Sequence, residues 1–286
     1  MLTEFKIETD FGTLAAKRWG VGTRKVLVMH GWLDNAASFD VLAPLLADTE
    51  CVVVDFLGHG LSDHLPGQRL YSLDLHIQGI EQVIDFLGWA TFSVLGHSLG
   101  AIVGSCIAAD SRFSKRVDSL ISLDALGPLS AELMASDHPA VEVVDKMRSR
   151  RHRAPRIYES VEQMYQSRAR ANQLDTKFIK GLVERGAKAV NEGWMWRFDP
   201  KLLIKNKLKY VNETAVFALL KKLTCPVALI RAKHGILPRN AGFNQRLAMV
   251  NTLYFYELDG GHHVHLEAAT QVANCIQEFW QQISLA

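Results

Sequence analysis

The segment Gly96-His97-Ser98-Leu99-Gly100 constrains this chain more than any other part of its sequence. It directly follows a short apolar run at 92–95 and begins a helix-length apolar segment at 99–109. A serine at a sharp strand-to-helix turn needs glycines two residues before and after it, because Cβ atoms there would collide with the adjacent strand and helix. The segment therefore predicts a turn that presents the Ser98 hydroxyl above the carboxyl edge of a sheet. An ordinary glycine-rich turn is the alternative.

Short apolar runs alternate with helix-length amphipathic segments in two blocks of the chain, separated by residues 127–224. This alternation predicts an α/β fold with a mostly parallel central sheet and helices on both faces. The expected strands are an opening hairpin at 5–7 and 13–19, followed by 26–29, 52–55, 92–95, 120–123, 227–230 and 253–258. The expected helices are 39–46, 73–87, 99–109, 241–249 and 268–283.

The separating segment, 127–224, has no convincing strand and contains helical pieces divided by prolines and glycines. We interpret it as an all-helical cap inserted after the strand that ends at Asp124, between two core segments, 1–126 and 225–286. It holds 19 Lys and Arg against 11 Asp and Glu, and its densest basic patch is Arg148, Arg150, Arg151, Arg153 and Arg156. Such a patch indicates a solvated helix face or a surface that attracts an anionic substrate or partner.

The composition is that of an ordinary globular protein, with 48% apolar and 22% charged residues. A net charge of only +2 does not indicate nucleic-acid binding, which requires a strongly basic surface. The N-terminal residues do not resemble a signal peptide, and no apolar window approaches the ~20 residues needed to cross a bilayer. The four cysteines lie in apolar stretches without a C-x-x-C pair, which predicts buried thiols rather than disulfides or a zinc site. Together these features predict a cytoplasmic protein.

An acyl-transfer site needs two backbone N–H donors for its oxyanion, one after the nucleophile and one in an earlier strand-to-helix loop. Leu99 follows Ser98, and Trp32 follows the expected strand at 26–29, so their N–H groups are the candidates. His30, in the same loop, is interpreted as a structural histidine.

A serine hydroxyl is a weak nucleophile unless an adjacent base accepts its proton. Three histidines cluster after the last expected strand, and two glycines directly before His262 would let its loop approach Ser98. His262 is therefore the predicted base, with His263 as second choice. The pair His263 and His265 could instead ligate a metal, but no carboxylate or thiolate accompanies it at suitable spacing.

The acid that orients this histidine is expected at the carboxyl end of a strand between the serine and the histidine. Asp124 directly follows the expected strand at 120–123 and is the predicted acid. Asp259, in the turn before His262, is the alternative acid. Asp124 could instead have a purely structural role, as the cap of a helix or turn at the end of the strand.

These motifs together resemble the α/β-hydrolase superfamily along the whole chain. They are His30-Gly31-Trp32, Asp55-x-x-Gly58-x-Gly60-x-Ser62, Gly96-His97-Ser98-Leu99-Gly100 and Gly261-His262. The segments at 230–235 and 262–265 are similar to those of its serine hydrolase-like proteins. The chain departs from the superfamily at Gly235, where most members place the acid, and Asp124 matches the position that some members use. Asp55 lies in a motif that has an architectural role in these proteins.

The resemblance implies Ser98 as nucleophile and His262 as base. It implies the N–H groups of Trp32 and Leu99 as the oxyanion hole. A serine at this turn favours acyl transfer over routes through an alkyl ester on a carboxylate, so small carboxylic esters are the expected substrates, without metal or organic cofactor.

The same residues could cleave thioesters, amides or carbon–carbon bonds. The alternative to an enzyme is a receptor or binding module of this fold that does not turn over a substrate. The cap should cover the substrate pocket. The candidates for an apolar lining, or alternatively for the core of the cap, are Leu133, Met134, Met147, Met164, Tyr165, Trp194, Trp196 and Phe198.

Overall fold

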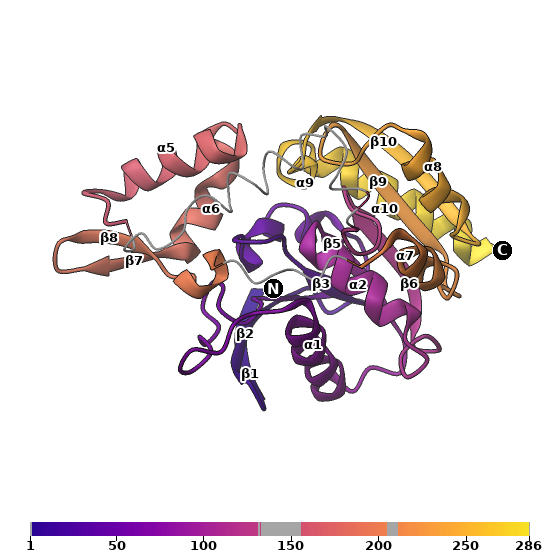
Figure 1. Cartoon of the computed structure of the whole chain (residues 1–286), viewed down its shortest axis with the longest axis horizontal. Helices are drawn as coiled ribbons and strands as arrows, with labels where there is room; N and C mark the ends of the chain where they lie inside the picture. Colours follow the sequence, from indigo (N-terminus) through magenta and orange to yellow (C-terminus); the bar gives the residue numbers. More distant parts are fainter. Residues whose placement is uncertain (1, 131, 133–155, 205–210, 286) are drawn as a thin grey trace.

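The computed structural model describes residues 2–130, 132, 156–204 and 211–285. The strands of its central sheet are β1 (Leu2–Thr9), β2 (Gly12–Trp19), β3 (Arg24–Met29), β4 (Thr49–Val54), β5 (Phe92–His97), β6 (Val117–Leu123), β9 (Val227–His234) and β10 (Leu253–Gly261). Their order across the sheet is β1-β2-β4-β3-β5-β6-β9-β10 (Figure 1). β2 pairs antiparallel with both β1 and β4, and the other pairs are parallel.

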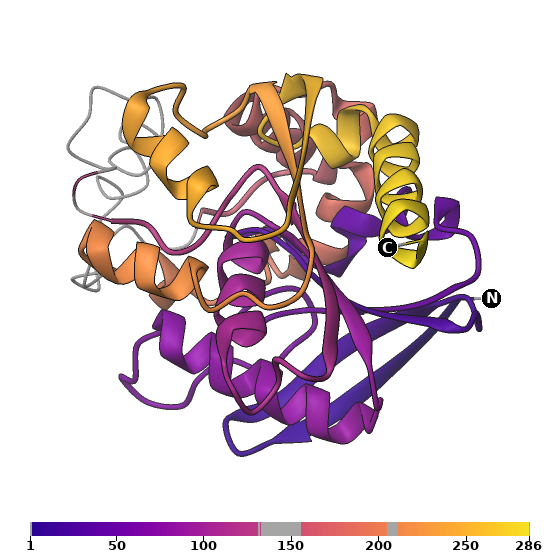
Figure 2. The ribbon, with the colours of Figure 1, turned by 90° about the vertical axis from the view of Figure 1, so that its right-hand side faces the viewer.

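Alternate residues of the central strands face opposite sides of the sheet, and both sides are apolar. In β3, Leu27 and Met29 pack on one side. Val26 and Val28 pack on the other. The first side is covered by α1 (Leu73–Leu87), α2 (Leu99–Ala109), α7 (Glu213–Leu220) and α8 (Ala241–Ala248), and the second by η1 (Ala36–Phe39), α9 (Val264–Glu267) and α10 (Ala269–Leu285). Figure 2 shows α10 and α2 on opposite sides of the strands. The predicted α/β architecture is therefore confirmed.

The prediction of an α-helix at 39–46 is wrong. Two short 3₁₀ segments occupy this region, η1 and η2 (Ala43–Leu45). Asn35 caps η1 by accepting the N–H of Ala37, and Pro44 lies inside η2. Proline has no N–H and clashes with the preceding helical turn, so a continuous α-helix cannot pass through this position.

The insertion contains helices, as predicted, but the expectation that it is all-helical is wrong. Besides α7, its described residues form α5 (Val161–Asn172), α6 (Thr176–Gly186), β7 (Ala187–Val190), β8 (Gly193–Trp196) and η3 (Pro200–Leu203). β7 and β8 form an antiparallel hairpin, and two main-chain bonds of 2.7 Å between Tyr158 and Trp194 extend it. Gly193 has φ 137°, and a Cβ there would lie 2.3 Å from the Tyr158 carbonyl oxygen. Strands of four residues are too short to give a clear periodic pattern.

The insertion has its own apolar cluster, and Figure 1 shows α5, α6 and the hairpin set apart from the sheet. Its buried members are Tyr158, Met164, Ala169, Ile179, Leu182, Val183, Ala187 and, from the core, Leu266. Met164 is thus a core residue of the insertion, and Tyr165, Trp194 and Trp196 pack against the same cluster. Phe198 packs against the main core. The other candidates for a pocket lining, Leu133, Met134 and Met147, lie outside the described residues.

The structure shows the environment of the cysteines and of part of the basic patch. All four cysteines are free thiols, with Cys51 and Cys225 buried. Burial raises the pKa of Cys51 to about 11. No described helix is both long and apolar enough to cross a membrane. Of the basic patch, Arg156 alone is described, and its guanidinium lies 4.6 Å from the ring centroid of Tyr158.

A buried ion pair joins the insertion to the core. Arg185 of α6 contacts the Asp55 carboxylate, after β4, through Nε and Nη2 at 2.9 and 2.8 Å. Asp55 is fully buried and also accepts the N–H groups of Ala36 at 2.6 Å and Leu61 at 2.9 Å. Nη1 of Arg185 reaches Glu4 of β1 at 2.9 Å. These bonds support the architectural role expected for Asp55.

We expect Arg185→Met to reduce the free energy of unfolding by about 3 kcal/mol, because loss of one partner leaves a buried charge uncompensated. Urea denaturation followed by circular dichroism measures the change. Arg170→Met is the matched control, since Arg170 is exposed on α5 and donates to the Gln166 carbonyl. Equal losses in the two variants would contradict this account of the ion pair.

Candidate active site

The predicted strand–turn–helix unit is present, with Ser98 between β5 and α2. Ser98 has φ 50° and ψ −111°, a conformation that residues with a Cβ rarely adopt. A Cβ at Gly96 would lie 2.3 Å from the carbonyl carbon of Gly100. One at Gly100 would lie 2.1 Å from the carbonyl oxygen of Met29 in β3. Close backbone contacts therefore require both glycines and hold the serine in its strained turn.

His262 and Asp124, the predicted base and acid, are directly bonded. Nδ1 of His262 lies 2.7 Å from Oδ2 of Asp124, whose side chain is completely buried. The N–H of Ala232 donates to Oδ1 at 3.1 Å, and the N–H of Ile236 donates to Oδ2 at 2.9 Å. Because the carboxylate accepts, Nδ1 of His262 donates, which makes its Nε2 the proton acceptor.

The Asp124 carboxylate fills the space beside Gly235, where most members of the superfamily place their acid. An added Cβ at Gly235 would lie 2.2 Å from Oδ2 and 2.5 Å from Oδ1 of Asp124. A side chain at position 235 and this carboxylate therefore exclude one another. The carboxylate that occupies this space comes from the residue after β6, and a glycine at position 235 leaves room for it.

The alternatives considered for the acid and the base lie elsewhere. Asp259 has a side chain 83% exposed, with Oδ1 3.4 Å from Nε2 of His234. His263 is buried, and its Nε2 lies 3.4 Å from Oδ2 of Asp34. Burial lowers the pKa of His263 to about 4. The bonded pair His262 and Asp124 therefore remains the candidate base and acid.

His97 connects the His262 loop to the elbow, the turn between β5 and α2 that carries Ser98. Its Nε2 lies 2.9 Å from the carbonyl oxygen of His262, and the two ring centroids are 4.6 Å apart. Since Ser98 directly follows His97, this bond fixes the His262 loop beside the serine. The three predicted residues thus lie at the carboxyl ends of β5, β6 and β10, and a hydrogen bond joins two of them, His262 and Asp124.

The two candidate oxyanion donors follow the neighbouring strands β3 and β5. Leu99 begins α2, where N–H groups have no intrahelical acceptor and the helix dipole favours negative charge. The loop that carries Trp32 is held by His30, which donates from Nδ1 to the Gly31 carbonyl at 2.7 Å and accepts the Phe56 N–H at 3.1 Å. Burial lowers the pKa of His30, consistent with a neutral structural histidine.

The sequence did not reveal a buried polar group behind the elbow. Asp34 directs Oδ2 toward Nδ1 of His97 at 3.6 Å and Nε2 of His263 at 3.4 Å. Its Oδ1 contacts Nη2 of Arg168, from α5. Burial opposes ionisation of Asp34, but His263, His97 and Arg168 hold the pKa of its carboxyl well below the usual range. No local motif links Asp34 to these partners, which lie more than sixty positions away in the chain.

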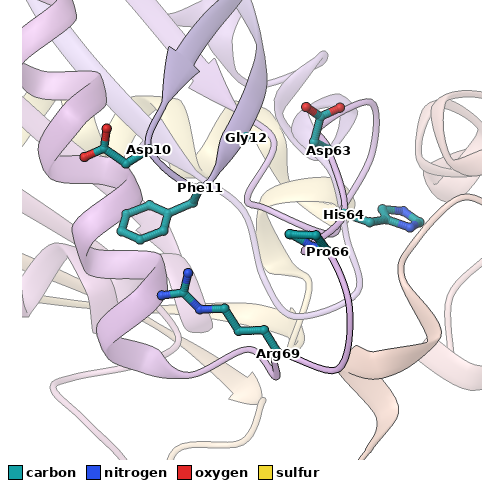
Figure 3. A pocket seen from close by; sticks show the side chains of 7 residues that line it. All are labelled: Asp10, Phe11, Gly12, Asp63, His64, Pro66 and Arg69. Carbon is teal, nitrogen blue, oxygen red and sulfur yellow. The ribbon is translucent and has the colours of Figure 1, made fainter.

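A surface hollow of about 390 Å³ lies apart from this group, at the turn between β1 and β2. Figure 3 shows residues 10–12 of the turn facing Asp63, His64, Pro66 and Arg69 across it. No residue of the Ser98, His262 and Asp124 group lines it, so we assign it no role in substrate binding.

We expect Gly100→Ala to destabilise the protein by about 1–3 kcal/mol, because its Cβ would press on the backbone of β3. Chemical denaturation measures the change. Gly79→Ala in α1 is the control, since its Cβ would have its nearest neighbour outside the local helix backbone, a methyl carbon of Leu57, at 3.8 Å. That change should be neutral or stabilise by up to about 1 kcal/mol. Equal stabilities would refute the close-contact explanation for Gly100.

Comparison with known proteins agrees with the fold and the motifs. Residues 25–269 match the family model described as alpha/beta hydrolase fold. Serine hydrolase-like protein 2 of Homo sapiens is 33% identical over 98% of this chain and 95% of its own length. The serine hydrolase-like protein of Danio rerio is 30% identical over 98% and 88%. A solved hypothetical protein from Pseudomonas aeruginosa PAO1 is 32% identical, with a TM-score of 0.83 over 97% of this chain and 99% of that one. This chain belongs to the α/β-hydrolase fold family and is similar to its serine hydrolase-like proteins.

Proposed function

We propose that this protein is a serine hydrolase that cleaves carboxylic esters through an acyl-enzyme intermediate. The observation that carries the proposal is the 2.7 Å bond between His262 and the buried Asp124, beside the strained Ser98. A carboxylate behind an imidazole fixes the tautomer in which Nε2 accepts a proton and stabilises the imidazolium that results. The pair therefore supplies the base that a serine nucleophile requires.

In the proposed cycle, Ser98 attacks the ester carbonyl carbon while Nε2 of His262 takes the hydroxyl proton. The N–H groups of Trp32 and Leu99 donate to the resulting oxyanion. The His262 imidazolium then protonates the departing alcohol, which leaves an acyl-serine. Water, deprotonated by His262, hydrolyses this ester and restores the serine. The cycle uses no metal ion or organic cofactor.

We also propose that residues 1–126 and 225–286 form the catalytic core and that 127–224 form a cap over it. Two side chains of α5 support this division: Arg168 contacts Asp34, and Nδ2 of Asn172 lies 3.2 Å from Nε2 of His263. Both contacts lie within a few residues of Trp32 and His262. A cap in this position would limit the site to a small acyl substrate.

The same residues could act on thioesters, amides or carbon–carbon bonds, since the triad chemistry is common to them. A binding module without turnover is the candidate from another class. A panel of p-nitrophenyl esters of increasing chain length, with matched thioesters, separates these possibilities by their kcat/KM values.

We expect a fluorophosphonate probe to label the wild type at Ser98 and not to label Ser98→Ala, because the probe reacts with activated serines. Gel fluorescence and peptide mass spectrometry measure the labelling. Ser105→Ala, on the same helix, should label as the wild type does; Ser105 donates to the Ala101 carbonyl at 2.8 Å. A folded wild type that remains unlabelled would favour the binding module.

We expect Asp124→Asn to lower kcat for ester hydrolysis by roughly 10⁴-fold, because the amide no longer fixes the tautomer of His262. Gly235→Ala should lower it by on the order of 10²-fold, because the added Cβ displaces the carboxylate from the imidazole. Stopped assays with p-nitrophenyl acetate measure both.

Gly242→Ala is the matched control for the second change, since a Cβ there would have its nearest neighbour at 3.5 Å. It should hydrolyse the ester at the wild-type rate. Unchanged turnover in Asp124→Asn would remove Asp124 from the triad.

A further inference from the structure

Three buried side chains behind the elbow direct ligand-type atoms toward one point. These atoms are Oδ2 of Asp34, Nδ1 of His97 and Nε2 of His263, and all lie within 4.8 Å of one another. Asp34 follows β3, His97 ends β5 and His263 follows β10, so the set is held by the ends of three strands. Each residue is at most 9% exposed.

The hydrogen bonds around His97 leave two acceptors facing each other. A carbonyl oxygen can only accept, so Nε2 of His97 donates to that of His262 at 2.9 Å. In the neutral ring, Nδ1 of His97 then carries a lone pair, and it faces Oδ2 of Asp34 at 3.6 Å. Both atoms are buried without a hydrogen-bond partner in the part of the chain that the structure describes.

The third atom adds another acceptor at the same place. Nδ2 of Asn172, an amide donor, lies 3.2 Å from Nε2 of His263, which makes that nitrogen an acceptor. The same nitrogen lies 3.4 Å from Oδ2 of Asp34. Acceptors that face one another in a buried site lose their hydration without compensation. A cation at the centre would satisfy Oδ2 of Asp34 and Nδ1 of His97, and it would take the lone pair of His263 Nε2 in place of the Asn172 amide.

The spacing of these atoms fits a small transition-metal ion. In a tetrahedral zinc site, bonds of about 2.0–2.1 Å place neighbouring ligand atoms roughly 3.4 Å apart. Two of the three distances, those from Oδ2 of Asp34, are 3.6 and 3.4 Å, and the third, between the two imidazole nitrogens, is at most 4.8 Å. Imidazole ligands suit zinc, cobalt and nickel, whereas magnesium and calcium prefer oxygen.

The surroundings of the three side chains are also those of metal sites. A histidine bound to a metal donates its other N–H to a carbonyl or carboxylate, as His97 does to His262. Asp34 engages Arg168 through Oδ1, which leaves Oδ2 for a single metal bond. His265 packs on His97 with ring centroids 4.2 Å apart and restricts the orientation of its ring.

We propose that Asp34, His97 and His263 bind one divalent transition-metal ion, with Zn²⁺ as the best fit. A water molecule, or the side-chain oxygen of Asn172 after rotation of its amide, would supply the fourth ligand. The ion would lie between the elbow and α5, and its binding does not depend on whether Ser98 is a nucleophile.

The test uses the full-length protein after treatment with a chelator. Titration with Co²⁺ should give the strong visible absorption of tetrahedral cobalt, saturating at one ion per chain, and Zn²⁺ should displace it. Asp34→Asn and His263→Gln should each weaken Co²⁺ binding by at least about 100-fold, at the upper limit of what loss of a supporting residue costs. His234→Gln, which removes a histidine 66% exposed, should bind as the wild type does.

Circular dichroism establishes that each variant is folded. Anomalous diffraction at the zinc edge from wild-type crystals locates the ion without any variant, and the peak should lie between Asp34, His97 and His263. A folded wild type that binds no stoichiometric Co²⁺, variants that bind it with wild-type affinity, or a peak at other residues would each overturn the proposal. A proton shared between Asp34 and His97 would then explain their approach.

Discussion

The buried carboxylate of Asp124 is the interaction on which the candidate site depends. A carboxylate without solvent is unfavourable unless its lone pairs are occupied, and here the N–H groups of Ala232 and Ile236 and the imidazole of His262 occupy them. These partners come from β9, from the loop after it and from the loop after β10. One side chain therefore joins the carboxyl ends of three parallel strands, and the absence of a side chain at Gly235 gives it room.

Close backbone contacts at Gly96 and Gly100 hold Ser98 in its turn. His97 connects this turn to the residues bonded to Asp124. The bond from His97 to the carbonyl of His262 fixes the backbone of the residue whose ring Asp124 orients. The other nitrogen of His97 faces Asp34, which contacts Arg168 of the insertion. A series of polar contacts thus runs from β6 past the elbow to α5, with hydrogen bonds as far as His97 and a 3.6 Å approach between His97 and Asp34.

The sequence was sufficient to predict the structure where one local pattern determined it. The glycines around Ser98 predicted the elbow because close backbone contacts at Gly96 and Gly100 make any larger residue there unfavourable. The sequence was insufficient where distant segments decide the outcome. The hairpin of β7 and β8 consists of four-residue strands that depend on pairing with Tyr158. Asp34 comes together with His97 and His263 only because β3, β5 and β10 end at the same edge of the sheet, and this is why spacing along the chain gave no sign of it.

The charge asymmetry of the chain has a structural explanation among the described residues. The insertion carries an excess of basic residues, and two of them, the partly buried Arg168 and the buried Arg185, contact the core carboxylates Asp34 and Asp55. These carboxylates follow β3 and β4, neighbouring strands that end at the sheet edge where the candidate site lies. Part of the positive charge therefore attaches the insertion to the core and is not available to attract an anionic substrate. An insertion held by these ion pairs is sensitive to any change in charge at Asp34, because the same carboxylate faces both Arg168 and the elbow histidine.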